Sequence, residues 1–203
     1  MTAGAGPGVV FLCGPRSGGN SDAAGLAFAR GLARAGGEAE IVRLRDHTVA
    51  PCRGCGTCAR KGHRCPLARP GDAAEALFEK LRAAPVAAFA APIYFYHVPA
   101  LFKALIDRAQ RHYEARLAAE AAAPTAAAPP ARAAHVLLVA GRPRGERLFE
   151  GTLLTLKYFL WPFHLRPAEP CLLRGLDAPG DLAADAGAMA RVEAYGEDAG
   201  RGT

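Results

Sequence analysis

The chain has 203 residues, of which 51% are hydrophobic and 22% charged, and its formal net charge is +6. This length and composition predict one globular domain over residues 1–203 and exclude a disordered chain. The basic residues are scattered, aromatic residues make up only 7%, and no apolar run approaches the ~20 residues of a membrane span, so neither a nucleic acid nor a membrane is an expected partner.

Strands and helices are predicted to alternate along the chain. Short apolar runs predict strands at 8–13, 39–44, 85–91, 134–140 and 169–174. Apolar residues spaced at i, i+3, i+4 and i+7 predict helices at 21–35, about 72–83, 98–115, 147–161 and about 181–195. Five hydrophobic strands with helices between them predict an α/β fold, in which a doubly wound parallel sheet carries helices on both faces.

Three segments fall outside these elements. A cysteine loop occupies residues 51–66, an Ala/Pro-rich stretch at 118–133 is expected to be an exposed loop, and a polar tail at about 196–203 is expected to be flexible. The first residues lack the basic region and the long apolar core of a signal peptide. A cytoplasmic location is therefore expected, where thiols stay reduced and structural disulfides are rare.

The loop after the first strand, GPRSGGNS at 14–21, has the composition of a phosphate site. Its glycines let the backbone approach an anion, and Ser17, Asn20 and Ser21 add side-chain donors. The following helix directs its free N–H groups and its positive dipole end to the same place. The loop has neither the Lys–Ser/Thr pair of a Walker loop nor the spaced glycines of a dinucleotide fold. An ordinary glycine-rich turn with an Asn or Ser cap is the alternative.

The cysteine loop contains Cys52, Cys55, Cys58 and Cys65 in the spacing C-x2-C-x2-C-x6-C. A compact C-x2-C-x2-C run with a fourth, later cysteine is the ferredoxin-type way to bind a 4Fe–4S cluster. Structural zinc usually divides its ligands into two separated pairs, so one crowded run fits zinc less well. Zinc held by the four thiolates, or free thiols without a metal, are the alternatives.

The loop after the third strand, within APIYFYHVPALFKALIDR at 91–108, gathers ring side chains. Ligands of open parallel sheets bind at the carboxyl ends of the strands. Four consecutive rings before a helix cannot all pack inward, so some are expected to flank a planar ligand. Together with the phosphate loop, this segment predicts a planar, phosphorylated cofactor.

These two segments resemble the flavodoxin-like NAD(P)H-dependent FMN reductases, in which a G-S-P-R-x-G-N-[ST] loop and a P-x-Y-x-x-x-[VP]-x-x-x-K-x-x-x-D-R segment hold FMN. The cysteine run between them is similar to that of the iron–sulfur flavoprotein branch. The resemblance extends over roughly residues 8–175 and implies a five-stranded flavodoxin-like sheet in the order 2-1-3-4-5.

The resemblance also implies the roles of individual residues. Arg16, Ser17, Asn20 and Ser21 would hold the FMN phosphate, and Pro92, Tyr94, Phe95, Tyr96 and His97 would line the isoalloxazine ring. Pro15, Gly19, Ile93 and Gly141 complete the expected FMN site from the same loops and from the loop after the fourth strand. Lys103, Asp107 and Arg108 match the motif as helix or subunit-contact residues.

The function implied is an FMN-binding oxidoreductase. It would accept electrons from NAD(P)H or a ferredoxin-like donor and pass them through FMN and a 4Fe–4S cluster to a small-molecule or protein acceptor. A homodimer or homotetramer is expected because the flavin ring needs cover from water. The cluster is expected at the subunit boundary, near the phosphate side of the flavin site. The alternative is an FMN-poor module whose cysteines hold structural zinc or no metal.

Overall fold

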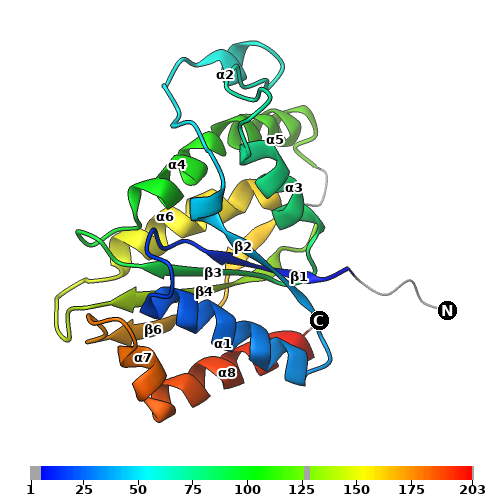
Figure 1. Ribbon diagram of the computed structural model, residues 1–203. Helices are drawn as coiled ribbons and strands as arrows, with labels where there is room; N and C mark the ends of the chain where they lie inside the picture. The colour runs from blue at the N-terminus through cyan, green and yellow to red at the C-terminus, as the bar shows by residue number, and fades with distance from the viewer. Residues whose placement is uncertain (1–5, 126–128, 203) are drawn as a thin grey trace.

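The computed structural model describes residues 6–125 and 129–202, which are built around a parallel sheet (Figure 1). Its strands are β1 (Gly8–Leu12), β2 (Ala39–Arg43), β3 (Ala87–Pro92), β4 (Arg132–Ala140), β5 (Leu165–Pro167) and β6 (Cys171–Arg174). They lie in the order β2-β1-β3-β4-β5, β6 also pairs with β4, and each pair is parallel. The predicted α/β fold and 2-1-3-4-5 order are confirmed.

The helices form one layer on each face of the sheet (Figure 1). One layer holds α1 (Asn20–Arg34), α7 (Asp181–Ala184) and α8 (Ala186–Arg201); the other holds α3 (Ala74–Ala83), α4 (Ala100–Arg108), α5 (Gln110–Ala122) and α6 (Glu150–Leu160). Two 3-10 turns, η1 (Leu44–Asp46) and η2 (Trp161–Phe163), follow β2 and α6. The short helix α2 (Thr57–Arg60) belongs to residues 51–71, called the cysteine segment below.

Alternate residues of each central strand face the two helix layers, which produces two hydrophobic cores. Phe11 of β1 stacks on Phe89 of β3, with ring centroids 5.0 Å apart, beneath α3, α4 and α6. Val10 and Leu12 point the other way and pack under α1 and α8. Both faces are buried, as the nearly continuous apolar strand sequences predict.

Two glycines allow α1 and α8 to approach each other closely. A Cβ added to Gly31 would lie 1.9 Å from the carbonyl oxygen of Glu193, and one added to Gly196 would lie 2.0 Å from that of Phe28. No side chain fits at either position, so the two backbones meet in direct contact. The prediction of a flexible tail is therefore wrong for residues 196–201, which are helical and pack on α1. Residue 203 lies outside the described residues.

The fifth strand position differs from the single predicted strand at 169–174. It is shared by β5, which pairs with Arg132–Ala134, and β6, which pairs with Leu137–Ala140. Pro167 and Pro170 lack the backbone N–H that a continuous ladder requires. Between the two paired stretches of β4, the N–H of Val136 lies 3.4 Å from the Tyr195 hydroxyl.

The predicted helix at 98–115 is also divided. The chain turns at Ala109, whose N–H bonds to the carbonyl of Ile106, three residues back, at 3.0 Å. Helix α5 then continues to Ala122, so the Ala/Pro-rich stretch does not begin as a loop at 118. Alanine is the best helix former and the first proline is Pro124, which explains the extension. Residues 126–128 lie outside the described residues. Among the described helices, none has the length and hydropathy required to cross a membrane.

Candidate functional site

A cavity of about 390 Å³ opens at the carboxyl ends of β1, β3 and β4. It is lined by Gly14, Pro15, Arg16, Gly19, Asn20, Ser21, Pro92, Ile93, Tyr94, Phe95, Tyr96, Val139, Ala140, Gly141, Arg142, Leu148, Leu176 and Asp177. The structure thus brings together the glycine-rich loop after β1 and the aromatic loop after β3, as the fold requires. We call this the sheet-edge cavity.

The glycine-rich loop is held by a buried ion pair beneath it. Gly18 has a positive φ of 68°, and its N–H bonds to Oδ2 of Asp22 at 3.0 Å. Arg45, from η1, lies 2.9 Å from the same oxygen and bonds to the carbonyl of Gly14 at 3.3 Å. The first residue of the loop, its turn and the first turn of α1 are therefore tied to one another. No side chain caps the start of α1, because Gly19 occupies that position.

Asn20 does not serve as the side-chain donor that its position suggests. Its Nδ2 donates to the carbonyls of Leu176 and Ala178 at 3.1 and 2.8 Å, and its Oδ1 accepts from the N–H of Leu182 at 3.1 Å. Both amide hydrogens are therefore used within the protein. Asn20 joins the start of α1 to the segment after β6, so its role at the cavity is structural.

The aromatic loop is a hairpin with an unusual turn. The backbones of Tyr94 and His97 exchange two hydrogen bonds, at 2.8 and 3.0 Å. The two residues between them, Phe95 and Tyr96, both have positive φ, at 49° and 63°. Turns with two such residues normally contain Asn and Gly, because residues with bulky side chains are strained in this conformation. Phe95 is fully exposed, at 102%. Strain that holds two exposed rings at a cavity rim is typical of a ligand site.

Two predicted site residues do not line the sheet-edge cavity. Ser17 is exposed and is not among the residues that line the cavity. The Nε2 atom of His97 lies 2.9 Å from Oγ1 of Thr155 on α6, and burial, together with the charge of Lys103, lowers the pKa of His97. A neutral imidazole that bonds to α6 anchors the hairpin on that helix.

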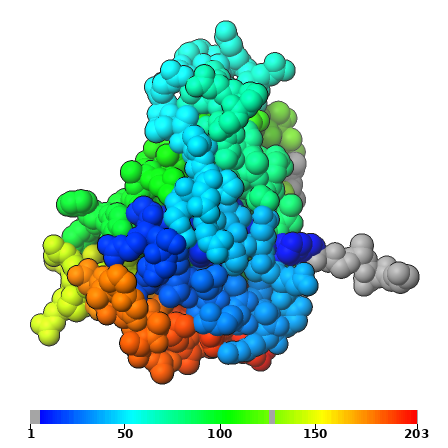
Figure 2. Space-filling model, in the orientation of Figure 1, coloured from blue at the N-terminus to red at the C-terminus, as the bar shows by residue number. Residues whose placement is uncertain are grey.

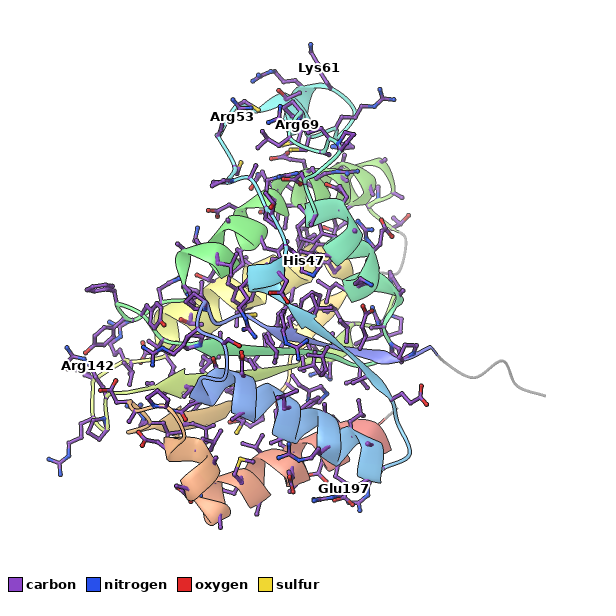
Figure 3. The ribbon with its side chains drawn as sticks, viewed as in Figure 1. His47, Arg53, Lys61, Arg69, Arg142 and Glu197 are labelled. Atoms are coloured by element: carbon purple, nitrogen blue, oxygen red, sulfur yellow. The ribbon has the colours of Figure 1, made fainter. Side chains whose placement is uncertain are left out.

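The cysteine segment forms a lobe above α4 and α5 (Figure 2). A second cavity of about 700 Å³, here the cysteine cavity, lies between this lobe and those helices. Cys52, Cys55, Cys58 and Cys65 all line it, together with Arg53, Gly54, Gly56, Thr57, Ala59, Pro66, Leu67, Asp107, Arg108, Gln110, Arg111 and Glu114. Figure 3 shows Arg53, Lys61 and Arg69 on the lobe, and all three are exposed. The sequence-predicted metal residues are therefore gathered around one space.

The four thiols are free and differ in their surroundings. A hydrogen bond with the Thr57 hydroxyl, 3.3 Å away, lowers the pKa of Cys55, whereas burial raises that of Cys58. In the described residues, no three His, Cys, Asp or Glu side chains are grouped to hold a single metal ion. Glycines with positive φ at Gly54 and Gly56 let the chain turn tightly around the cavity.

The two cavities have no lining residue in common. In Figure 1 the cysteine segment stands over α4 and α5, whereas the strands end at the left of the molecule. Strand topology predicts that the cysteines lie near the phosphate side of the flavin site. Within one chain, the cysteines do not lie there. The segment leaves β2 through η1 and passes outside the helix layer, because α4 and α5 fill the space next to the sheet.

The model of the NADPH-dependent FMN reductase family matches residues 8–148. The chain belongs to this family. The match begins with β1 and extends beyond β4, so it includes the glycine-rich loop, the cysteine segment and the aromatic hairpin.

Curated relatives of this FMN reductase family member include two iron-sulfur flavoproteins. The protein of Methanosarcina thermophila is 40% identical over 73 residues, which are 36% of this chain and 36% of the relative. The protein of Methanocaldococcus jannaschii is 31% identical over 96 residues, which are 47% of this chain and 48% of the relative. The matched segment thus spans less than half of the length of either relative.

Solved structures support the fold of this family. An NAD(P)H:quinone oxidoreductase from Methanothermobacter marburgensis superposes with a TM-score of 0.66 at 20% identity, and 94% of each chain is covered. An azoreductase from Bacillus anthracis superposes with a TM-score of 0.63 at 14% identity, covering 97% of this chain and all of the other. At these identities the likeness concerns the fold alone.

Several lining residues of this FMN reductase family member were not predicted from the sequence. Arg142, which follows Gly141, lies with its guanidinium 5.9 Å from the centre of the Tyr96 ring, and Leu176 and Asp177 come from the segment after β6. Arg142 carried a signal in the sequence, because it belongs to GRPRGE at 141–146, whose arginines follow a strand at the ligand end of the sheet. Leu176 and Asp177 had no recognisable signal in the sequence, because only the pairing of β6 with β4 brings them to the cavity.

Proposed function

We propose that this protein is an FMN-binding oxidoreductase that accepts electrons from NAD(P)H or a ferredoxin-like donor. One observation carries the proposal: a glycine-rich loop at a helix start and a strained aromatic hairpin face one cavity at the carboxyl ends of the strands. The first suits a phosphate and the second suits a flat conjugated ring. Membership in the NADPH-dependent FMN reductase family supports the same assignment.

The residues around the sheet-edge cavity fit FMN. The uncapped start of α1 offers backbone N–H groups to the phosphate, and Arg16 adds a positive charge beside them. Tyr94, Phe95 and Tyr96 offer ring faces to the isoalloxazine. Bound FMN supplies chemistry that the side chains lack, since it takes up two electrons at once and releases them singly. The protein's part is to bind the cofactor, orient it and restrict water.

We further propose that the four cysteines hold a 4Fe–4S cluster. A single zinc ion needs its sulfur ligands within about 3.8 Å of one another, given Zn–S bonds of about 2.3 Å. The thiols instead stand around a cavity of about 700 Å³ and are not grouped for one ion within the described part of the chain. A cavity of this size suits a multi-atom cluster better. The two curated relatives, both named iron-sulfur flavoproteins, support the proposal.

We also propose that the protein assembles as a homodimer or homotetramer. Two observations support this: the rings at the rim of the sheet-edge cavity are exposed, and Leu154 and Tyr158 of α6 are each 58% exposed. Because the two cavities are separate within one chain, a neighbouring subunit would bring a cluster closer to a flavin. Light scattering of the FMN-loaded protein tests the assembly, and a monomer would contradict it.

The decisive experiment is an anaerobic purification followed by absorbance, cofactor and metal analysis. FMN and the paired flavin bands are expected, with about four iron and four sulfide per chain and a broad absorbance shoulder. Oxidation of NADH and NADPH is then measured with a quinone and with a ferredoxin as acceptors. Recovery of FAD alone would contradict the FMN assignment. FMN with zinc or no metal would contradict only the cluster, and a protein without flavin would favour the alternative of a zinc-binding or metal-free module.

A further inference from the structure

Arg108, the last residue of α4, is the most deeply buried charged side chain near the cysteine cavity. Its side chain has no exposed surface, although its neighbours Asp107 and Gln110 are exposed. The Nη1 atom lies 2.7 Å from Oδ2 of Asp72 and donates to the carbonyl of Ala50 at 3.1 Å. These two bonds use both hydrogens of Nη1 and connect the residues on either side of the cysteine segment.

The other two nitrogens of the guanidinium are placed differently from Nη1. Within the described residues, Nε and Nη2 of Arg108 are buried and make no hydrogen bond of ordinary geometry. They carry three N–H groups in the planar fork of the side chain. Leaving such charged donors buried and unpaired is costly, so native proteins rarely do it without a ligand.

Arg108 is one of the residues that line the cysteine cavity, and its guanidinium lies near the sulfur of Cys65, one of the four cysteines there. An arginine guanidinium is not deprotonated in proteins, and the Asp72 carboxylate 2.7 Å away pairs with its charge. The guanidinium therefore keeps its charge inside the protein. A fixed cation, with three N–H groups that lack an ordinary hydrogen bond, therefore lies beside Cys65 at the cysteine cavity.

We propose that Arg108 donates its free N–H groups to sulfur atoms of the anionic metal–thiolate centre in this cavity. The inference rests on the proposed cluster and adds a residue that no cysteine motif contains. The negative charge of four thiolates exceeds the positive charge of the iron–sulfide core, so the whole centre is an anion. N–H donors to the sulfur atoms help to set the reduction potential of such clusters. Arg108 thus acts as a positioning residue that stabilises the centre and raises its potential.

The test compares wild type with Arg108→Lys, both loaded anaerobically with iron and sulfide. Lysine keeps the positive charge and can still pair with Asp72, but it lacks the donors at Nε and Nη2. We expect Arg108→Lys to release iron to a chelator at least about tenfold faster and to show a lower cluster potential in an EPR-monitored titration. FMN content should be unchanged, which also reports that the variant is folded. Equal release rates and equal potentials would overturn the proposal.

Two further variants separate hydrogen bonding to the centre from simple support of the loop. Arg132→Lys removes guanidinium bonds to the carbonyls of Ala84 and Arg82, outside the cysteine cavity, and should behave as wild type. Asp72→Asn weakens the connection across the cysteine segment but leaves the free N–H groups of Arg108 in place, so iron release should stay within about threefold of wild type. If Asp72→Asn loses iron as fast as Arg108→Lys, loop support explains the effect and the proposal is wrong.

Failure of the cluster itself gives a different result. A wild type that takes up no iron and sulfide removes both the cluster and the role of Arg108. A wild type that holds the cluster, with an Arg108→Lys variant indistinguishable from it, removes the role of Arg108 alone.

Discussion

Arg45 and Asp22 form a two-pronged ion pair directly under the glycine-rich loop: Nη2 of Arg45 lies 2.9 Å from Oδ2 of Asp22, and Nη1 lies 3.1 Å from Oδ1. The Asp22 side chain is only 5% exposed. A carboxylate buried in the first turn of α1 would repel a phosphate at the same helix start if nothing balanced it. Arg45 supplies that balance and also holds the carbonyl of Gly14.

We therefore expect Arg45→Ala to weaken FMN binding by roughly ten- to a hundredfold, because it leaves the Asp22 charge uncompensated beside the phosphate. The double variant Arg45→Ala/Asp22→Asn should recover a large part of this loss. Quenching of FMN fluorescence on binding measures both affinities. Arg30→Ala, also on α1, breaks an exposed pair with Glu193 of α8 and is the control. An Arg45→Ala variant with wild-type affinity would place the phosphate away from this helix start.

Asn20→Ala should reduce the stability of the fold as well as FMN affinity. It removes three hydrogen bonds that join α1 to the segment 176–182, and we expect a loss of about 1–3 kcal/mol in the free energy of unfolding. Ser17→Ala changes an exposed residue of the same loop and should stay within about 0.5 kcal/mol of wild type. Urea unfolding of the FMN-free proteins measures this difference. Equal stabilities of the two variants would contradict the structural role of Asn20.

Replacing Phe95 and Tyr96 by Asn and Gly should stabilise the protein and weaken FMN binding. The new residues accept positive φ readily, so the free energy of unfolding should rise by about 1–2 kcal/mol. Loss of both rings should lower FMN affinity by about tenfold. Tyr158→Ala, which removes an exposed ring of α6 outside the cavity, controls for ring loss alone. A double variant that is less stable than wild type, or that binds FMN equally well, would contradict the idea that strain is kept for binding.

Cys58→Ser should abolish iron binding and leave FMN in place, because the two cavities share no lining residue. Iron, sulfide and FMN are measured per chain after anaerobic purification. Cys171→Ser, at a cysteine outside the segment, should retain both cofactors. Loss of FMN together with iron in Cys58→Ser would show that the two sites depend on each other.

Acid should weaken the packing of α3 against α5 through Glu75. Burial alone would raise the pKa of Glu75, but the nearby His112 ring, 3.6 Å away, and the hydrogen-bonded guanidinium of Arg111 lower it from 4.5 to about 2. Because the folded-state pKa is the lower one, the stabilisation is fully present above about pH 4.5 and is lost as the pH falls towards 2. Glu75→Gln should remove this part of the pH dependence. Urea unfolding between pH 5 and 2.5 checks it, and parallel curves for the two proteins would contradict it.

The sheet was predictable because each central strand is a short apolar run and helices separate the strands. Element ends were less predictable, since they depend on contacts between distant segments. The last helix continues to Arg201 because Gly196 lets it pack on Phe28 of α1, and a glycine in a polar sequence otherwise indicates a helix end. In the same way, the break at Ala109 has no proline or glycine to announce it.

Prediction of the candidate site from the sequence was limited in the same way by contacts between distant segments. The glycine-rich loop and the aromatic loop were found because the residues themselves indicate their chemistry. The roles of Asn20 and His97 were missed, because an amide or an imidazole in a motif does not reveal that its partner lies more than fifty residues away. Arg108 was read as a helix or subunit-contact residue, since only the folded chain shows it beneath the cysteine cavity.

The two ends of the cysteine segment lie side by side. The N–H of Ala73 bonds to the carbonyl of Thr48 at 2.9 Å, and the N–H of Ala50 bonds to Oδ2 of Asp72 at 2.9 Å. About twenty residues thus leave the body of the protein and return to the point of departure. The segment is therefore exchangeable: a short turn could close the gap, and loops of other sequence could be grafted between Ala50 and Asp72 without altering the strand order. The scaffold can gain, lose or replace the cysteine segment while the sheet-edge cavity stays as it is.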